Sequence, residues 1–236
     1  MRDLEYWQEK LALKSAEEAI YIIGKELGSY ARFSTSLGME DQVITHLISH
    51  HAPDVSIFTI DTGRMFQETY DLLDLTRQHF HLPIATYFPL QSEVEKLVTT
   101  KGANSFYNSV EDRKECCHIR KVEPLKRALS GAKFWITGIR AEQSINRKTM
   151  MPLEWDEQYR VFKYHPLFYW TQQEVDDFIE QNKIPINTLH RKGFPSIGCA
   201  PCTRAVAAGE DPRSGRWWWE GSAKECGLHQ VKLKAS

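Results

Sequence analysis

Five cysteines lie in three places along this chain, and their spacing indicates metal and thiol chemistry. Cys116 and Cys117 are adjacent, Cys199 and Cys202 form a C-x-x-C pair, and Cys226 stands alone near the C-terminus. Because a fold can bring remote pairs together, the two pairs can supply four thiolates to one iron–sulfur cluster or one zinc ion. A four-cysteine zinc site usually combines two C-x-x-C pairs, so the adjacent pair favours a cluster but leaves zinc open.

The fifth thiol, Cys226, would then be free to react. It precedes a glycine and lies between Lys224 and His229. Mobility and nearby positive charge make a thiolate nucleophile available. Against this, a lone cysteine is more often an inert buried side chain, and a C-x-x-C pair can be a redox dithiol.

Composition excludes several classes of protein. The chain has 236 residues, 42% of them hydrophobic, which is enough for a sizeable core. A formal net charge of −1 argues against a nucleic-acid or membrane surface spread over the whole chain. No secretory signal or bilayer-spanning run is apparent. We therefore expect a cytoplasmic protein, whose cysteines bind metal or carry out redox chemistry instead of forming disulfides.

Short apolar runs that alternate with helical stretches must hold these residues in place. This alternation predicts an α/β fold with a doubly wound, mostly parallel sheet and right-handed crossovers. Before it, residues 4–27 predict one amphipathic helix that ends at Gly28. The expected strands lie near 31–33, 55–60, 84–88 and 134–137, and the expected helices near 40–50, 65–80, 92–100 and 118–129.

Further elements follow from local patterns. Ser92-x-x-Glu95 and Thr171-x-x-Glu174 are capping boxes that predict helix starts, and a short hairpin or an irregular β segment is expected within 150–165.

The chain should divide into three parts. We expect an N-terminal helix in 1–28, a nucleotide-binding α/β domain in 29–185, and a C-terminal segment, 186–236, that lies over the active edge of the sheet.

Polar residues follow three of the expected strands and predict a nucleotide site. Parallel strands place such loops at one edge, where open α/β sheets bind ligands. The first loop leads into a helix, whose free N–H groups and dipole can hold a phosphate. Single loops of this kind often only turn the chain, but three at one edge favour a ligand site. The candidate residues are Ser34, Ser36, Gly38, Asp61, Thr62, Gly63, Gly138, Arg140 and Arg147.

Basic residues gather around the cysteines. Lys121 follows Cys117 by one turn of a helix expected to open at Cys116. Beyond Cys202 come Arg204, Arg213 and Arg216, followed by three tryptophans, for which we favour packing in a core or between subunits. The cations can neutralise an anionic cluster and bind an anionic substrate, although Lys121 could equally lie on an ordinary solvated face.

Taken together, four motifs resemble the assimilatory adenylyl-sulfate (APS) reductases. These are relatives of the phosphoadenylyl-sulfate (PAPS) reductases and, more distantly, of the ATP pyrophosphatases. The resemblance runs from about residue 30 to His229. Its motifs are Cys116–Leu125, Gly138–Ser144, Gly198–Arg204 and Glu225–His229.

The resemblance implies a cofactor and a reaction. It implies one 4Fe-4S cluster per chain, held by the two cysteine pairs, and reduction of APS to sulfite and AMP. It also implies that the loop from Ser34 to Asp41 is a degenerate pyrophosphate loop. ATP pyrophosphatases have Ser-Gly-Gly-x-Asp there, whereas this chain has Leu37 before Gly38 and Met39 after it. That departure fits a site that no longer cleaves ATP.

By the same resemblance, the Cys226 thiolate would attack the phosphosulfate sulfur, expel AMP and form S-sulfocysteine. A thioredoxin or glutaredoxin would then release sulfite, and Gly221 and Ser222 could form a hinge for the moving thiol. The cluster need not change its oxidation state, and a homo-oligomer is expected. The residues implied to surround the phosphosulfate are Lys121, Arg213, Arg216 and His229.

Three alternatives remain open from the sequence. The first is PAPS reduction by the same thiol chemistry, although enzymes devoted to PAPS usually lack the cysteine pairs. The second is an ATP-dependent tRNA thiolation enzyme or amidase-like ligase, against which the altered loop argues. The third is a metal-stabilised nucleotide sensor in which Cys226 is a redox-responsive thiol.

Overall fold

The computed structural model describes residues 2–221, except for the side chains of Arg2, Ile145 and Asn146. Two compact units interleave along the chain. Unit 1 comprises residues up to 59, 72–85 and 129–186, and unit 2 comprises 60–71, 86–128 and the residues from 187 onward. Each unit is thus assembled from three separate stretches.

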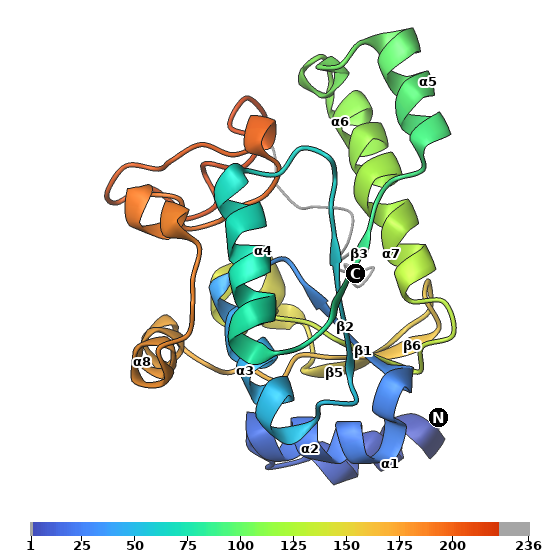
Figure 1. Cartoon of the computed structure of the whole chain (residues 1–236), viewed down its shortest axis with the longest axis vertical. Coiled ribbons are helices and arrows are strands. Elements are labelled where there is room, and N and C mark those ends of the chain that lie inside the picture. Colours follow the sequence, from blue (N-terminus) through green and yellow to red (C-terminus); the bar gives the residue numbers. More distant parts are fainter. Residues whose placement is uncertain (1, 222–236) are drawn as a thin grey trace. The chain divides into compact units, whose positions relative to one another are not determined.

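Unit 1 is built on a six-stranded sheet with the order β3-β2-β1-β4-β6-β5 (Figure 1). β1 pairs in parallel with β2 and β4, β4 pairs in parallel with β6, and β5 is an antiparallel edge. The strand order reverses between β1 and β4, and the predicted doubly wound α/β fold is confirmed. The strands are β1 Ala31–Thr35, β2 Ser56–Ile60, β3 Ile84–Tyr87, β4 Phe134–Ile136, β5 Leu153–Asp156 and β6 Val161–Tyr164.

Side chains from the strands and helices form the core of unit 1. Phe33, Phe134, Ile136 and Tyr164 are buried in one hydrophobic cluster together with side chains from the helices. Of the two possibilities expected within 150–165, a short hairpin or an irregular β segment, the antiparallel β5–β6 pair confirms the hairpin. The helices are α1 Arg2–Leu11, α2 Ala16–Leu27, α3 Met39–His51, α8 Gln172–Asn182 and α4 Gln67–Phe80, whose first residues belong to unit 2.

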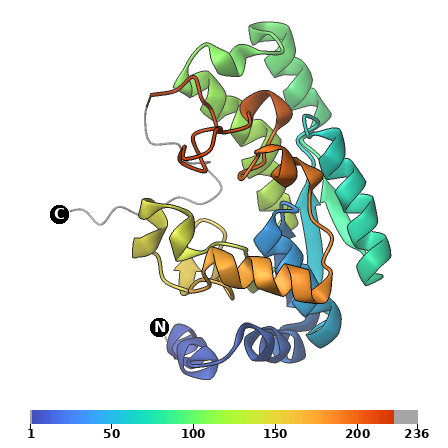
Figure 2. The same ribbon diagram turned by 90° about the vertical axis from the view of Figure 1, so that its left-hand side faces the viewer.

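The single N-terminal helix expected over 4–27 is wrong, because the structure has two helices there (Figure 2). Leu13 has a positive φ of 56°, which stops α1. Ser15 then caps α2, accepting from the Glu18 N–H while the Glu18 carboxylate accepts from the Ser15 N–H. This capping box was present in the sequence and marks the break.

Of the two predicted capping boxes, one is confirmed and one is wrong. Thr171 and Glu174 form the expected box at the start of α8. In contrast, α5, Gln91–Lys101, begins after Leu90, so Ser92 lies inside the helix and caps nothing.

Unit 2 contains a helical run that holds the first cysteine pair. α6, Val110–Cys117, continues through a π-helical turn over His118–Val122 into α7, Glu123–Ala128, and α5 lies beside α6 (Figure 1). The expected helix near 118–129 is therefore wrong at its start, because the Ser109 side chain caps a helix that begins at Val110. The cysteines end α6 instead of opening a helix.

Among residues 2–221, no helix is both long enough and apolar enough to cross a membrane.

Candidate functional site

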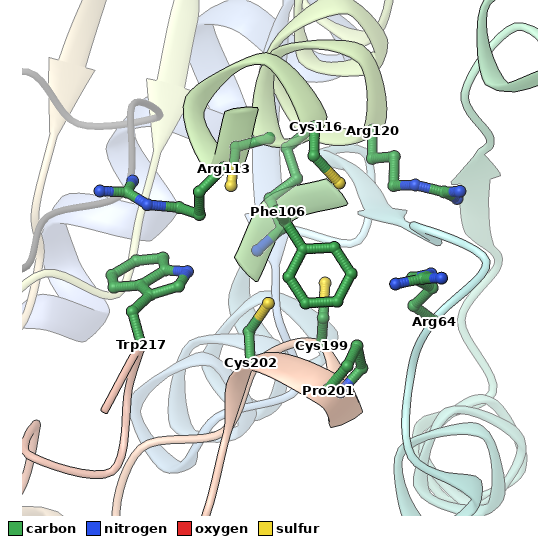
Figure 3. Close-up of a pocket in the computed structure, with 11 residues that line it drawn as sticks. Arg64, Phe106, Arg113, Cys116, Arg120, Cys199, Pro201, Cys202 and Trp217 are labelled. Carbon is green, nitrogen blue, oxygen red and sulfur yellow. The ribbon is translucent and has the colours of Figure 1, made fainter. Parts of the chain in front are cut away.

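The four paired cysteines line one pocket in unit 2. Cys116, Cys117, Cys199 and Cys202 are all buried. In Figure 3 the sulfur atoms of Cys116, Cys199 and Cys202 turn toward the same space. The two pairs, predicted from the sequence to meet at one centre, are thus brought together. The rest of the lining is Arg64, Phe106, Arg113, Arg120, Lys121, Pro201 and Trp217.

Short helical turns aim the thiols into the pocket. Cys116 and Cys117 lie at the end of α6, immediately before the π-helical turn. Cys199 and Cys202 bracket a 3₁₀ turn over Ala200–Cys202, in which the Cys202 N–H donates to the Cys199 carbonyl at 2.9 Å. The Thr203 hydroxyl donates to the same carbonyl at 3.0 Å. The C-x-x-C pair is therefore held by hydrogen bonds local to the loop.

Thr62 contacts two of the residues that line this pocket. Its hydroxyl lies 3.2 Å from Cys199 Sγ, and its carbonyl accepts from Arg120 Nη1 at 2.6 Å. Gly63 has a positive φ of 70°, which favours glycine, and its N–H donates to Asp61 Oδ1 at 2.7 Å. The sequence placed Asp61, Thr62 and Gly63 in a nucleotide site, and the structure gives this turn contacts at the cysteine pocket. Their role toward a nucleotide stays a prediction.

Burial makes two thiols of this pocket, those of Cys116 and Cys202, poor acids. It raises the pKa of Cys116 above its usual value, and it raises the pKa of Cys202 to about 12. Nearby cations act in the opposite direction, Arg120 on Cys116 and Lys121 on Cys202. The pocket thus combines buried sulfur donors with positive charge that favours their ionised form.

The donor set fits a group held by thiolates. Four cysteines are the ligands of both iron–sulfur clusters and closed zinc sites, and the surrounding guanidinium and ammonium groups suit a net negative centre. Over residues 2–221, however, no group of three or more His, Cys, Asp or Glu side chains is found in an arrangement that could hold a metal ion.

Arg216 and Arg213 lie in the C-terminal part of unit 2. Arg216 is buried with its guanidinium 4.9 Å from the Trp217 ring centre. A Cβ on residue 198 would lie 2.2 Å from Arg216 Nη2, so Gly198 leaves room for this side chain. Arg213 is half-buried in a turn where its N–H donates to Asp211. Of the tryptophans expected to pack in a core or between subunits, Trp217 is buried, whereas Trp218 is 40% exposed.

The first predicted phosphate loop lies in unit 1 and is closed by a carboxylate. The Ser36 N–H and hydroxyl donate to Asp41 Oδ2 at 2.6 and 2.7 Å. Ser34 Oγ accepts from the Trp135 indole at 2.8 Å, and Gly38 precedes α3. Burial raises the pKa of Asp41 to about 6. The donors expected to hold phosphate thus have internal partners in this structure.

The third predicted loop lies beside the first, because β4 pairs with β1 at the reversal of strand order. The buried Arg140 donates to Glu40, Gln172 and the Trp170 carbonyl, and Arg147 donates to Gln143. Arg140 therefore fixes the loop through its own contacts. Whether either arginine also binds phosphate stays a prediction.

Three residues of the pocket lining were not among the predicted site residues. Arg64, Arg113 and Arg120 line the cysteine pocket, and only their spacing of three or four residues from Cys116 could have marked Arg113 and Arg120. Of the predicted residues, Cys226, His229 and the hinge residue Ser222 lie outside the described range.

Residues 31–205 match the family model described as the phosphoadenosine phosphosulfate reductase domain. The chain belongs to this family. The match covers the sheet, both cysteine pairs and the loops at the reversal of strand order, and it confirms the resemblance found in the sequence motifs.

This chain is similar to curated relatives over most of their length. A protein of Neisseria meningitidis serogroup B named adenosine 5'-phosphosulfate reductase is 51% identical over 202 residues, which are 85% of this chain and 82% of the relative. A protein of the same name from Allochromatium vinosum is 46% identical over 217 residues, 92% of this chain and 84% of the relative.

Solved structures support the same fold. A PAPS reductase from Candida auris, in a phosphate complex, has a TM-score of 0.72 and 25% identity, with 87% of this chain and 97% of that chain covered. The FMN adenylyltransferase of Candida glabrata has a TM-score of 0.53 at 16% identity, covering 92% of this chain and 78% of that chain. The latter likeness concerns the fold alone.

Proposed function

We propose that the protein reduces adenylyl sulfate to sulfite and AMP in assimilatory sulfate reduction and cysteine biosynthesis. The observation that carries this proposal is the pocket in which both cysteine pairs and Lys121 meet, in a chain about half identical to relatives named for that substrate. The parallel sheet with loops at its strand-order reversal adds a place for the nucleotide.

The pocket would hold one 4Fe-4S cluster through Cys116, Cys117, Cys199 and Cys202. When bound, such a cluster supplies structure and negative charge close to the substrate, with no change of oxidation state required. Thr62 would donate a hydrogen bond to the Cys199 sulfur, and the pocket's cations would balance the charge of the four thiolates. Lys121, at the pocket wall, would also bind substrate oxygens.

Cys226 would perform the covalent step. Its thiolate attacks the sulfonate sulfur, a bond forms between the two sulfur atoms, and the bond to the phosphate oxygen breaks, so that AMP leaves. Lys121, Arg213, Arg216 and His229 would stabilise the departing oxyanion. A thiolate of thioredoxin or glutaredoxin then attacks Cys226 sulfur, sulfite leaves with the bonding electrons, and the donor's second thiol resolves the mixed disulfide.

PAPS is the second candidate substrate, since the Candida auris structural neighbour is named for it. The two nucleotides differ by the 3'-phosphate, which needs an additional cationic contact. We expect APS to be preferred, the reaction to take place in the cytoplasm, and the protein to be a homo-oligomer.

The decisive experiment is a single turnover of anaerobically purified protein with ³⁵S-labelled APS, followed by a non-reducing gel and peptide mapping. Label on Cys226 that thioredoxin releases as sulfite is the expected result. The variant Cys226→Ser should bind AMP and acquire no label. If intact, iron-loaded protein acquires no label from APS, the S-sulfocysteine mechanism is wrong, and PAPS use or a sensor role must be tested.

A further inference from the structure

A buried ion pair joins the cysteine-bearing helix α6 to the last described residues of the chain. Arg113 lies on α6, one turn before Cys117, and Glu220 immediately precedes Gly221. Nε and Nη2 of Arg113 donate to the two carboxylate oxygens of Glu220 at 2.8 and 2.9 Å. Both side chains are only 4% exposed. The forked geometry therefore fixes both the distance and the direction of this link.

A second set of contacts ties the same residues to the C-x-x-C loop. The Arg113 guanidinium lies 4.7 Å from the ring centre of Trp217, and both side chains line the pocket (Figure 3). The Trp217 N–H donates to the Cys202 carbonyl at 3.2 Å, and the Glu220 N–H donates to the Trp217 carbonyl at 2.9 Å. Residues 217–220 are thus attached to both cysteine pairs, through Arg113 on one side and through the backbone of Cys202 on the other.

Stability alone does not explain why this link is ionic. Removing two charges from water is costly, and apolar residues of similar volume often replace a buried pair without loss of stability. The two hydrogen bonds from Arg113 to Glu220 add a defined attachment point for the chain after residue 220. Arg113 is therefore better explained by positioning than by holding the fold together.

Chain length makes this attachment relevant to Cys226. Cys226 follows Glu220 by six residues, and an extended chain spans at most about 3.5 Å per residue. The two Cα atoms are therefore within about 21 Å of each other on any path. A short tether from a fixed point confines the thiol to a small volume and so raises its effective concentration near that point.

We propose that Arg113 and Glu220 are a positioning pair that fixes where the Cys226 segment leaves the cysteine pocket and thereby accelerates the attack of Cys226 on the bound sulfonate. The inference rests on the proposed function, because that reaction is the one accelerated. Neither side chain contacts the reacting atoms. Both act through the backbone of residues 217–221.

Two variants test the pair, so that the test does not depend on the correct folding of either one alone. Glu220→Gln keeps the shape of the side chain and removes its charge. The double variant Arg113→Met and Glu220→Met removes the fork without leaving a buried charge unpaired. Glu210→Gln is the matched control, since it breaks the solvent-exposed pair between Glu210 and Arg204.

The readouts separate positioning from folding. Iron and sulfide content and thermal unfolding report on the pocket, AMP affinity reports on the nucleotide site, and the single-turnover release of AMP from APS reports on the attack by Cys226. We expect at least a tenfold slower single turnover in both pair variants. Iron content should be unchanged and AMP affinity within twofold of the wild type, and the control should match the wild type throughout.

Lengthening the chain between Glu220 and Cys226 gives a further test, because a pair with a purely structural role would not change the response to the added length. Two glycines inserted after Gly221 should slow the single turnover of the wild type. The same insertion should have little further effect in the Glu220→Gln variant, because the two changes loosen one attachment. Fully additive effects would contradict the proposal.

Other outcomes also decide the question. A pair variant that retains iron and reacts at the wild-type rate overturns the positioning role while leaving the proposed function intact. Loss of iron in both pair variants assigns the pair to the pocket itself and likewise overturns it. A wild type that never reacts with APS overturns the proposed function and this inference together.

Discussion

A Cβ atom on residue 138 would lie 2.2 Å from Oδ1 of Asp41, so Gly138 and Asp41 are packed against each other as closely as a backbone permits. These residues follow β4 and β1, the two strands between which the order of the sheet reverses. The contact joins the two unit 1 loops predicted to bind the nucleotide.

Gly138→Ala should therefore disturb both stability and nucleotide binding. The added methyl group must displace Asp41, and overpacking of this kind costs about 1–3 kcal/mol. Thermal or denaturant unfolding should show that loss, with weaker AMP binding by calorimetry. Gly221→Ala is the control for stability, because no neighbour among residues 2–221 is found within 4 Å of a Cβ at that position. Equal unfolding midpoints for the two variants would contradict the contact.

Asp41 should give unit 1 a dependence of stability on pH. Burial raises its pKa from 3.8 to about 6, against the hydrogen bonds from Ser36. The folded protein then binds more protons than the unfolded chain between these values, so this group's contribution to stability is greatest below pH 3.8 and is lost as pH rises through 6. Relative to Asp41→Asn, the wild type should lose up to about 3 kcal/mol from pH 4 to 7. Parallel stability–pH curves for the two proteins would be the contrary result.

The sequence predicted the strands at the centre of unit 1 because their apolar residues are consecutive and buried. It did not predict α6, because its residues Val-Glu-Asp-Arg-Lys-Glu-Cys-Cys have no apolar face. The buried side chains of that helix are those of Arg113, Cys116 and Cys117, and all three line the same pocket. The cysteine pairs could be predicted to share one centre because the type and number of these residues are enough to indicate a site with four thiolates. The role of Arg113 could not be predicted, because it depends on a contact with residue 220, which is distant in the sequence.

Ser15→Ala and Ser92→Ala should differ in their effect although both serines precede a glutamate by three residues. Ser15 caps α2 reciprocally with Glu18, so its loss should cost about 1 kcal/mol of unfolding free energy. Ser92 lies within α5, where alanine is a better helix former, so Ser92→Ala should be neutral or slightly stabilising. Guanidinium unfolding of both variants measures the difference. A destabilised Ser92 variant would mean that α5 starts later than Gln91.

Thr62→Val should retain the 4Fe-4S cluster proposed for the pocket but alter its properties. The substitution keeps the shape of the side chain and removes the hydroxyl 3.2 Å from Cys199 Sγ. Hydrogen bonds to ligand sulfur raise the reduction potential of iron–sulfur clusters, so the potential should fall while iron content stays that of the wild type. Thr100→Val, on the exposed face of α5, is the control. An unchanged potential with full iron content would show that the hydroxyl does not donate to sulfur.

Lys121 and Lys114 offer a matched pair on one helical run for testing the electrostatic role of the pocket. Lys121 lines the pocket and favours the ionised form of Cys202, whereas Lys114 is exposed on α6. A cation that stabilises the oxyanion as AMP departs should be worth about 10²–10³ in kcat. Lys121→Ala should therefore lower kcat by that factor with a much smaller change in AMP affinity, and Lys121→Arg should restore part of the rate because it restores the charge. Lys114→Ala should react as the wild type does. If Lys121→Ala changes only KM, or if its rate loss follows loss of iron, Lys121 serves binding or the cluster instead of the transition state.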